Sequence, residues 1–364
     1  MWLSVLGLGI QGWTLWKWDA WRASHPLNQN KWPHPSTCSV VVCCHNEAGQ
    51  LKRLHDGLQA ALDQAAHEGI DVEVVAVNHG STDNTLKGLL DIAKRNKRWK
   101  IEDVPRLLPS KKEALESAVL AAQGEVIVAL DADCTPRHPS WLVDMTRGAS
   151  HHWDVHVGLG LPTTKQHRGL LHRLQRLEAR RLAQRAVGAV EAGRPYLAFG
   201  RNLAFTRAIW DQVGGFSAHK HLLSGDDDLW LQEAVKHGAR VKATPSPSAQ
   251  TTSLWPASWT AWRRQKTRHF SASRAYPVLL QSQLALPALG WVLLLGGVVH
   301  NGSGTSVGML LLATIARALT FGLFLKRAGQ PALEAWEICL EPLVSAFRAW
   351  AWFKGNMSDS TSWK

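Results

Sequence analysis

The chain has 364 residues, 45% of them hydrophobic, and a formal net charge of +12 at pH 7. This length leaves room for one folded core with appended elements. The positive charge indicates anionic partners, but no nucleic-acid-binding motif accompanies it, so we expect no nucleic acid among them. The cysteines, at positions 38, 43, 44, 134 and 339, have no framework spacing, which excludes a disulfide-stapled domain and favours a reducing, cytoplasmic compartment for the core.

The first segment, Met1 to Trp18, is apolar and carries tryptophans at positions 2, 13, 16 and 18. We expect residues 1–25 to form an N-terminal apolar anchor or an interfacial helix. No small-residue cleavage site follows it, which argues against a removable signal peptide.

Strand and helix patterns alternate from residue 39 to residue 130. Helical spacing of apolar residues separates the strands, and this alternation predicts an α/β fold with a mostly parallel sheet and helices on both faces. The predicted strands are Ser39–Cys44, Val72–Val77, Trp99–Val104 and Val126–Leu130. The helical stripes are Leu51, Leu54, Leu58 and Leu62; Leu86, Leu89, Leu90 and Ala93; and Ala114, Leu115, Ala118, Val119 and Ala122.

Polar residues gather directly after these strands. Asp131 and Asp133 close the fourth strand, His45 to Glu47 follow the first, and Asn78 to Asp83 follow the second. Ligands of open α/β sheets bind beyond the carboxyl ends of the strands, where two carboxylates can hold a divalent metal against a diphosphate. Turn and helix-cap preferences select the same residue types, so no single motif decides the function.

The ordered set of motifs resembles the family 2 glycosyltransferases, which have the nucleotide-sugar-binding GT-A fold. Residues Gln265 to His269 are similar to the Gln-x-x-Arg-Trp element of the membrane-bound members. The other matching segments are Ser39–Glu47, Gly80–Thr85, Lys111–Leu115, Gly200–Arg207, Gly214–Phe216 and Ser224–Leu229. The resemblance runs from about Ser39 to His269 and implies a GT-A catalytic domain over residues 36–272.

The resemblance also implies roles for individual residues. A divalent cation, Mn or Mg, is expected at Asp133, with Asp131 between the metal and the sugar-nucleotide hydroxyls; the two assignments are interchangeable. Asp227 is expected to be the catalytic base, with Asp226 as the alternative. The nucleotide-sugar-binding residues are expected to be Glu47, Asn78, His79, Asp83, Lys111, Asp131, Gln265 and Arg268. The acceptor-side residues are expected to be Gly200, Asn202, Asp228 and His269.

Two positions depart from the family pattern. Asn78 and His79 stand where the family usually has a carboxylate that hydrogen-bonds the nucleobase, and His269 replaces a tryptophan. An amide or a neutral imidazole still offers hydrogen bonds to a uracil edge. The seventeen histidines are scattered without zinc-binding spacing, which leaves open whether any of them completes the metal shell.

The C-terminal third contains two apolar runs, Val278–Val299 and Thr305–Leu325. Each reaches the roughly 20 residues that a membrane-spanning helix needs, and together they predict a transmembrane hairpin over residues 277–326. Basic residues flank both ends, which places the flanks and the catalytic domain on the cytoplasmic side of the cell (inner) membrane. Arg317 lies inside the second run, where a charge usually faces a partner or water. The alternative is a pair of interfacial helices that do not span.

Two further segments bear on the membrane. Residues 327–364 are expected to form an interfacial, amphipathic segment, since Trp336, Trp350 and Trp352 suit the headgroup zone. Arg168 to Arg185 predicts a strongly basic helix that either contacts anionic headgroups or has an ordinary solvated face.

The predicted function is a metal-dependent glycosyltransferase that moves a sugar from a nucleotide donor, a UDP-sugar, to a membrane-located lipid acceptor. No residue is marked as a nucleophile beneath the sugar, so direct displacement with inversion is expected. A polysaccharide-synthesising enzyme with a glycan acceptor is the first alternative. A non-catalytic membrane scaffold that retains the fold is the second.

Overall fold

The computed structural model describes residues 1–18, 35–107, 110–149, 152–162, 169–332 and 334–357. The chain divides into two compact units. The sheet unit lies within residues 24–163 and 195–254, and the helical unit lies within residues 1–23, 164–194 and 255–360. The predicted hairpin and the predicted basic helix both belong to the helical unit, although Arg168 itself lies outside the described residues.

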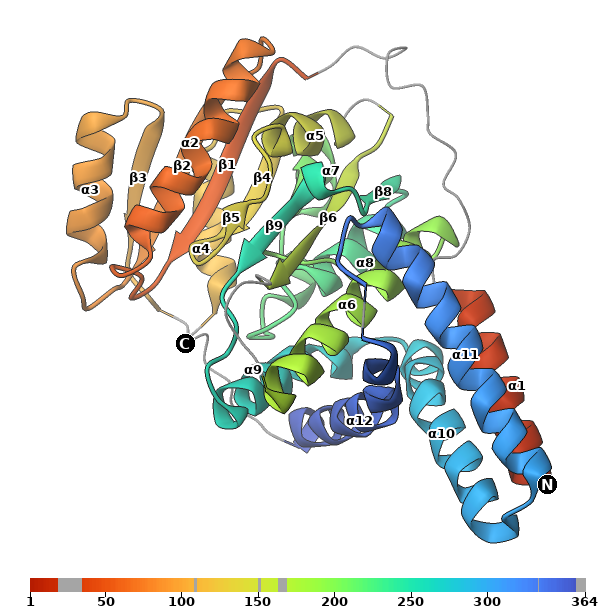
Figure 1. Cartoon of the computed structure of the whole chain (residues 1–364). Helices are drawn as coiled ribbons and strands as arrows, with labels where there is room; N and C mark the ends of the chain where they lie inside the picture. Colours follow the sequence, from red (N-terminus) through yellow and green to blue (C-terminus); the bar gives the residue numbers. More distant parts are fainter. Residues whose placement is uncertain (19–34, 108–109, 150–151, 163–168, 333, 358–364) are drawn as a thin grey trace. The chain divides into compact units, whose positions relative to one another are not determined.

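The sheet unit is built on a sheet with the strand order β3-β2-β1-β4-β7-β6-β9-β5, in which β8 pairs with β6 (Figure 1). The first four strands in this order are parallel, whereas β7 runs antiparallel to both of its neighbours. The strands are β1 Thr37–Cys44, β2 Asp71–His79, β3 Trp99–Val104, β4 Val126–Asp131, β5 Thr135–Pro136, β6 Val155–Pro162, β7 Leu203–Thr206, β8 Val241–Thr244 and β9 Gln250–Ser253. This arrangement confirms the mostly parallel α/β sheet.

The register of the sheet brings the predicted functional loops to one edge. Cys44 at the end of β1 pairs with Asn78 of β2, and Cys43 pairs with Asp131 of β4. The polar residues that follow these three strands therefore start from neighbouring positions.

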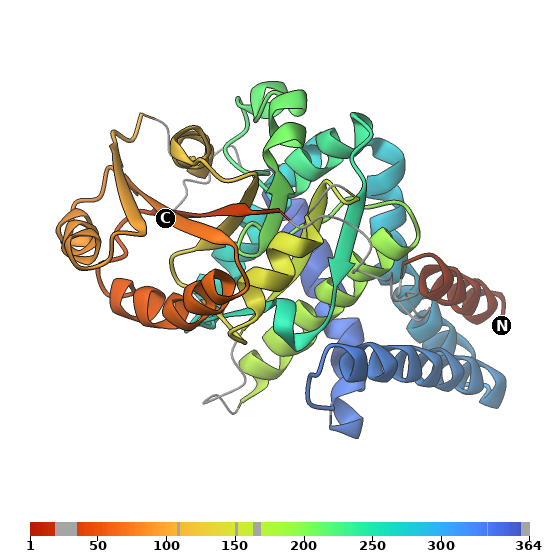
Figure 2. The same ribbon diagram turned by 90° about the horizontal axis from the view of Figure 1, so that it is seen from above.

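Helices cover both faces of this sheet (Figure 2). Alternate residues of β1, such as Val40 and Val42, join the core formed with α2 and α5, whereas Val41 and Cys43 point to the opposite face. The helices of the sheet unit are α2 Leu51–His67, α3 Thr85–Arg95, α4 Lys111–Ala121, α5 Trp141–Gly148, α7 Arg207–Val213 and α8 Asp228–Lys236, with the short turns η2 Ser217–His219 and η3 Pro247–Ala249.

The predicted apolar stripes of α2 and α4 are buried, but the stripe of α3 is only partly so. Leu89 is fully buried, whereas Leu90 is 44% exposed. The reason is the place of α3 beside β3, the edge strand of the sheet, where fewer neighbours cover a helix (Figure 1).

The helical unit contains α1 Trp2–Trp18, α6 Leu170–Glu191, α9 Trp259–Ser271, α10 Val278–Asn301, α11 Gly304–Arg327 and α12 Glu341–Met357, with η4 Ala272–Ala275 and η5 Ala335–Leu340. Two helices of the described chain, α10 and α11, are long and apolar enough to cross a membrane by length and composition, and they lie at the position of the predicted hairpin. Arg317 of α11 is buried and forms an ion pair with Glu341 of α12, as expected for a charge inside an apolar run.

Candidate functional site

The loops that follow β1 and β2 are joined by hydrogen bonds. Asn46, the one non-glycine residue with positive φ among those described (56°), donates from its backbone to Ser81 Oγ at 3.0 Å and accepts from Thr82 N at 2.8 Å. The buried Glu47 donates its N–H to Thr85 Oγ1. Asp83 accepts from the backbones of Ala48 and Thr85, so its carboxylate holds the two loops together at the start of α3.

Asn78 and His79, the two residues expected at the nucleobase, have different surroundings. Asn78 is 3% exposed and donates to Asp103 Oδ1 at 2.7 Å, while its Oδ1 accepts no hydrogen bond from the described residues. His79 is fully buried, with Nε2 3.3 Å from Glu113 Oε2, and burial lowers its pKa. Asn78 therefore offers a buried acceptor atom, and His79 is a neutral imidazole at physiological pH.

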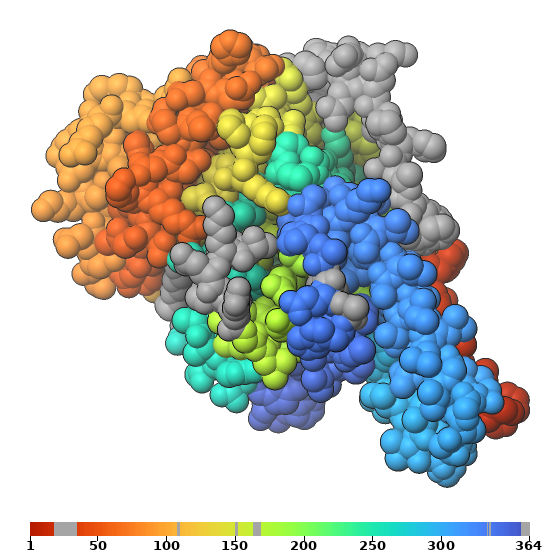
Figure 3. Space-filling model, viewed as in Figure 1, coloured from red at the N-terminus to blue at the C-terminus, as the bar shows by residue number. Residues whose placement is uncertain are grey.

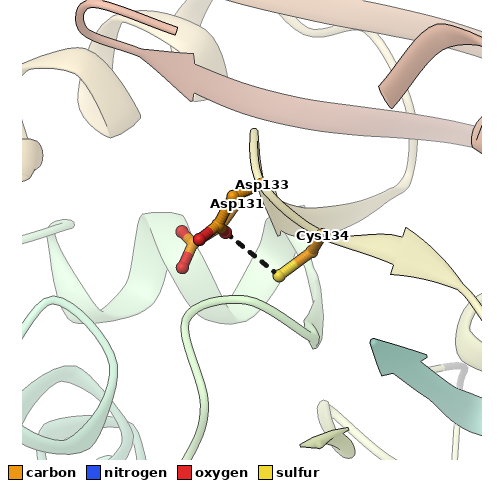
Figure 4. A group of neighbouring side chains, drawn as sticks. All are labelled: Asp131, Asp133 and Cys134. Carbon is orange, nitrogen blue, oxygen red and sulfur yellow. Dashed lines mark hydrogen bonds between the residues drawn. The ribbon is translucent and has the colours of Figure 1, made fainter. Parts of the chain in front are cut away.

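Asp131 and Asp133 form an acidic cluster at the end of β4. One carboxylate oxygen of each and the sulfur of Cys134 all lie within 4.8 Å of one another, the one such cluster in the described ranges (Figure 4). Burial, with Asp131 nearby, raises the pKa of Asp133. Burial also raises the pKa of Cys134, which donates to Asp133 Oδ1 and therefore stays a thiol.

Lys111, the first residue of α4, connects this cluster to a second acidic motif, Asp226 to Asp228. Its ammonium lies 2.5 Å from Asp131 Oδ1 and 3.5 Å from Asp226 Oδ2, and it donates to the carbonyl of Gly200. Burial alone would lower the pKa of Lys111, but Asp131 and Asp226 raise it overall. The two acidic motifs are far apart in the chain, and the structure places both beside the ammonium group of Lys111.

Asp227 is the N-cap of α8 and is held by two backbone N–H groups. Gly200 N donates to its Oδ2 at 3.0 Å, and Asp228 N donates to its Oδ1 at 2.8 Å. Burial and the neighbouring charge of Asp226 raise the pKa of Asp227. Asp228 is buried and caps the following residue, Leu229. A carboxylate with fixed orientation and raised proton affinity is the chemistry of a general base.

Arg201 is a charged residue at this site to which the sequence motifs assigned no role. It is half-buried and donates from Nη1 to Ser253 Oγ at 3.1 Å. Burial alone would lower its pKa, but the surrounding acidic groups, Asp131, Asp133 and Asp227 among them, raise it. The sequence could have marked Arg201 as a site residue, because it directly follows Gly200 in a segment that matches the family pattern.

Lys112 is a second residue that the motifs did not single out. Its fully buried ammonium donates to the carbonyls of His219 and Leu222 at 2.7 and 2.8 Å, and burial lowers its pKa to about 8. These carbonyls belong to the loop that leads to the acidic triplet at 226–228. Lys111 and Lys112 therefore point to different targets, one in the site and one in the loop that shapes it.

The remaining predicted residues have other surroundings. The amide of the fully buried Asn202 donates to Leu159 O and Ala249 O and accepts from Trp141 Nε1, so it holds strands and helix together. Gln265, Arg268 and His269 lie on α9 of the helical unit. The first two are half-buried and His269 is exposed. Their assignment to the donor and acceptor sites stays a prediction.

Comparison with known proteins bears on the family and the fold of the sheet unit. The model of the family "Glycosyl transferase family 2" matches residues 39–218. An uncharacterised glycosyltransferase of Synechocystis sp. is 35% identical over 95 residues, covering 26% of this chain and 29% of the relative. Glucosyl-3-phosphoglycerate synthase of Mycobacterium tuberculosis is 28% identical and covers 36% of this chain and 37% of the relative. The dolichyl-phosphate beta-glucosyltransferase ALG5C of Trichomonas vaginalis is 28% identical, covering 30% and 34%.

These curated relatives are matched over only about a third of their own length. A solved structure extends the comparison of the fold. The mannosyltransferase PcManGT of Pyrobaculum calidifontis, in complex with GDP-Man and Mn2+, superposes with a TM-score of 0.65 at 18% identity over 99% of this chain and 98% of that one. Through residues 39–218, the chain belongs to glycosyltransferase family 2, and its sheet unit has the GT-A fold.

Proposed function

We propose that this protein is a metal-dependent, inverting glycosyltransferase that moves a sugar from a UDP-sugar to a lipid acceptor at the membrane. The observation that carries the proposal is the position of Lys111, whose ammonium contacts Asp131 of the β4 cluster and Asp226 of the acidic triplet. A transferase needs a donor-side anion site and a base within reach of the same sugar carbon.

The residues present fit a divalent cation. Asp131 and Asp133 offer closely spaced carboxylate oxygens, the ligands that Mg and Mn prefer. The raised pKa of Asp133 reflects two carboxylates in a poorly solvated space, an arrangement that a cation relieves. Cys134, as a buried thiol, is not a ligand of hard cations. When bound, the metal would neutralise the negative charge that develops on the departing diphosphate.

Asn78 supports uridine as the base of the donor. Its buried Oδ1 is an acceptor without a partner among the described residues, and Asp103 fixes the orientation of the amide by accepting from Nδ2. A uracil ring presents one N–H donor at its N3 position, which matches this single acceptor. The Pyrobaculum enzyme holds GDP-Man instead, so uridine and guanosine donors are the two to compare.

The transfer step requires that the acceptor hydroxyl lose its proton as it attacks the sugar carbon opposite the leaving group. In the proposed mechanism Asp227 takes this proton, because its raised pKa strengthens it as a base and two backbone N–H groups fix its direction. Lys111 and Arg201 supply positive charge beside Asp131, where the diphosphate would lie. Displacement in one step inverts the anomeric centre.

A lipid acceptor is supported by the helical unit, because α10 and α11 are candidate membrane spans of this same chain. One relative, the Trichomonas enzyme, is named for a dolichyl phosphate acceptor.

The proposal is tested by incubating the purified protein with Mn²⁺, a panel of UDP- and GDP-sugars and a membrane lipid extract, followed by mass spectrometry of the products. A lipid that gains the mass of one sugar, absent with Asp227→Asn, is the expected result. A ladder of products differing by one sugar would favour the polysaccharide alternative. Failure of every donor to be consumed would contradict transferase activity.

A further inference from the structure

We infer that α1 is a third membrane-spanning helix, inserted beside α10 and α11 with the N-terminus at the same side of the bilayer as the α10–α11 turn. This inference goes beyond the proposed function and does not rest on it. All three helices belong to the helical unit, and the figures show α1 lying along α10 and α11 (Figures 1, 2 and 3).

The burial pattern of α1 is inverted relative to a helix in water. Its fully buried residues recur at helical spacing and are small or polar: Ser4, Gly7, Gln11 and Thr14. Its exposed large residues are apolar: Met1, Trp2, Leu3, Val5, Leu6 and Trp16. Soluble helices bury the apolar stripe and expose the polar one, whereas membrane helices place small and polar residues at helix contacts and apolar residues toward lipid.

The contact between α1 and α10 is close and antiparallel. A Cβ added at Gly7 would lie 2.9 Å from Gly290 O and Leu294 N, and a Cβ at Gly297 would lie 3.0 Å from Ser4 N. Gln11 donates to Pro287 O at 3.0 Å. Backbones that approach this closely through glycine are typical of helix pairs within membranes.

The contact with α11 is polar and involves the buried arginine of the hairpin. Arg317 Nη1 donates to Gln11 Oε1 at 3.1 Å and to Thr14 Oγ1 at 3.3 Å, while Nε donates to Glu341 at 2.7 Å. An arginine inside an apolar span is costly unless other groups replace its water. Gln11 and Thr14 supply part of that replacement, so α1 has to share the depth of α11 in the bilayer.

Length and charge agree with a spanning position. The 17 residues of α1 extend about 25 Å, at the short end of what a bilayer core of roughly 30 Å needs. Lys17 lies at one end of α1, and Lys326 and Arg327 lie at the end of the parallel helix α11. The opposite ends, Met1 and the turn at 301–303, carry no acidic or basic side chain. The positive-inside rule then places Lys17 at the cytoplasmic face.

An interfacial helix would differ in a testable way. Such a helix turns a charged face to water, whereas the polar stripe of α1 contacts α10 and α11 and its outward face is apolar. In a spanning α1 the two ends lie on opposite sides of the membrane. In an interfacial α1 both ends lie on one side.

The test introduces one accessible cysteine at a time and labels it with a membrane-impermeant thiol reagent in sealed membranes, before and after lysis. The background is Cys339→Ser, because Cys339 is exposed while the other four cysteines are buried. Added to it, one at a time, are Trp2→Cys, Lys17→Cys and Asn301→Cys. We expect positions 2 and 301 to label equally from one side and position 17 only from the other, with lysis raising only the label that was hidden.

Labelling of positions 2 and 17 from the same side, or of positions 2 and 301 from opposite sides, would overturn the inference. A second measurement does not depend on labelling and tests the packing of α1 against α10. Oxidation of Ser4→Cys with Gly297→Cys in the native membrane should form an intramolecular disulfide, since a Cβ at 297 lies 3.2 Å from Ser4 Cβ. The matched pair Gly9→Cys with Gly297→Cys should not, because no heavy atom of the described residues lies within 4 Å of a Cβ at Gly9. Equal crosslinking of both pairs would contradict the packing.

Discussion

Individual residues at this site are coupled by charge. Lys111 holds Asp131 and Asp226 in one cluster, and Asp226 in turn raises the pKa of Asp227. Replacing one carboxylate therefore changes the pKa of the next. The effects of single substitutions on activity then distinguish the catalytic base from its neighbours.

Asp227→Asn should reduce transfer by about 10² to 10⁴-fold, the usual contribution of a general base, while binding of the donor survives because the metal-side carboxylates are untouched. Turnover and UDP binding by calorimetry measure the two effects separately. Loss of UDP binding in this variant would show that Asp227 contributes to the donor site and is not the base.

Asp226→Asn should keep activity but move the acid limb of the kcat/KM profile to lower pH. The charge of Asp226 raises the pKa of Asp227, so its removal lets Asp227 stay ionised further into acid. Asp56→Asn, on the exposed face of α2, is the control and should leave the profile in place. If Asp226→Asn abolishes transfer while Asp227→Asn retains it, Asp226 is the base.

Arg201→Met should lower kcat/KM by roughly 10²-fold, because a fixed positive charge beside the proposed diphosphate site is lost. The same change should tighten binding of Mn²⁺, since Arg201 no longer competes for Asp131 and Asp133. Arg240→Met, an exposed pair with Asp154, serves as the control. Weakening of both transfer and metal binding would indicate that Arg201 only supports the fold.

Lys112→Met should lower kcat more than it raises the KM of the donor. Its two backbone carbonyl partners lie in the loop that precedes the acidic triplet, so the variant loosens the base rather than the nucleotide contacts. Steady-state kinetics with varied UDP-sugar separate the two constants. A change confined to KM would place Lys112 on the donor side instead.

At the scale of elements, the strands were predictable where their pattern is local. The strands β1, β2 and β4 each contain a run of valines and other buried residues, and the weaker Trp99–Val104 has the bounds that the sequence predicts. The short strands β5, β7, β8 and β9, of two to four residues, carry too few residues for a period to be visible. They form because distant segments pair with them, as β7 does with β4 and β6.

The site was predictable to the same extent. Asp131 and Asp133 stand at the end of β4 and the acidic triplet stands at the start of α8, so motifs marked both groups as candidates. Arg201 and Lys112 act through partners far along the chain, such as Ser253 and Leu222, and no local pattern announces such a contact. The polar stripe of α1 was likewise hidden, since Gln11 and Thr14 gain meaning only beside Arg317.

Helix packing gives a matched test within α1. Gly7→Leu should lower the free energy of unfolding of the detergent-solubilised protein by about 1–3 kcal/mol, and with it the melting temperature, because the new leucine side chain meets the backbone of α10. Gly9→Leu, two residues away on the open face, should leave the melting temperature unchanged. Equal melting of the two variants would show that α1 does not pack through Gly7.

At the scale of the whole molecule, the apolar helices and the basic flanks predict how the protein is held to the membrane. Three spanning helices resist high salt and alkaline carbonate and yield only to detergent, because their attachment is hydrophobic. A protein held only by the attraction of basic residues to anionic headgroups is released by salt. Fractionation of membranes under the two treatments, followed by immunoblotting, separates these cases.

The central claim is that the carboxylates at the end of β4 bind a nucleoside diphosphate through a divalent cation. Calorimetric titration of UDP into the purified protein, with and without Mn²⁺, tests it most directly. Binding should require Mn²⁺, persist in Asp227→Asn and vanish in Asp133→Ala. UDP that binds equally well without the metal, or to Asp133→Ala, would contradict the account.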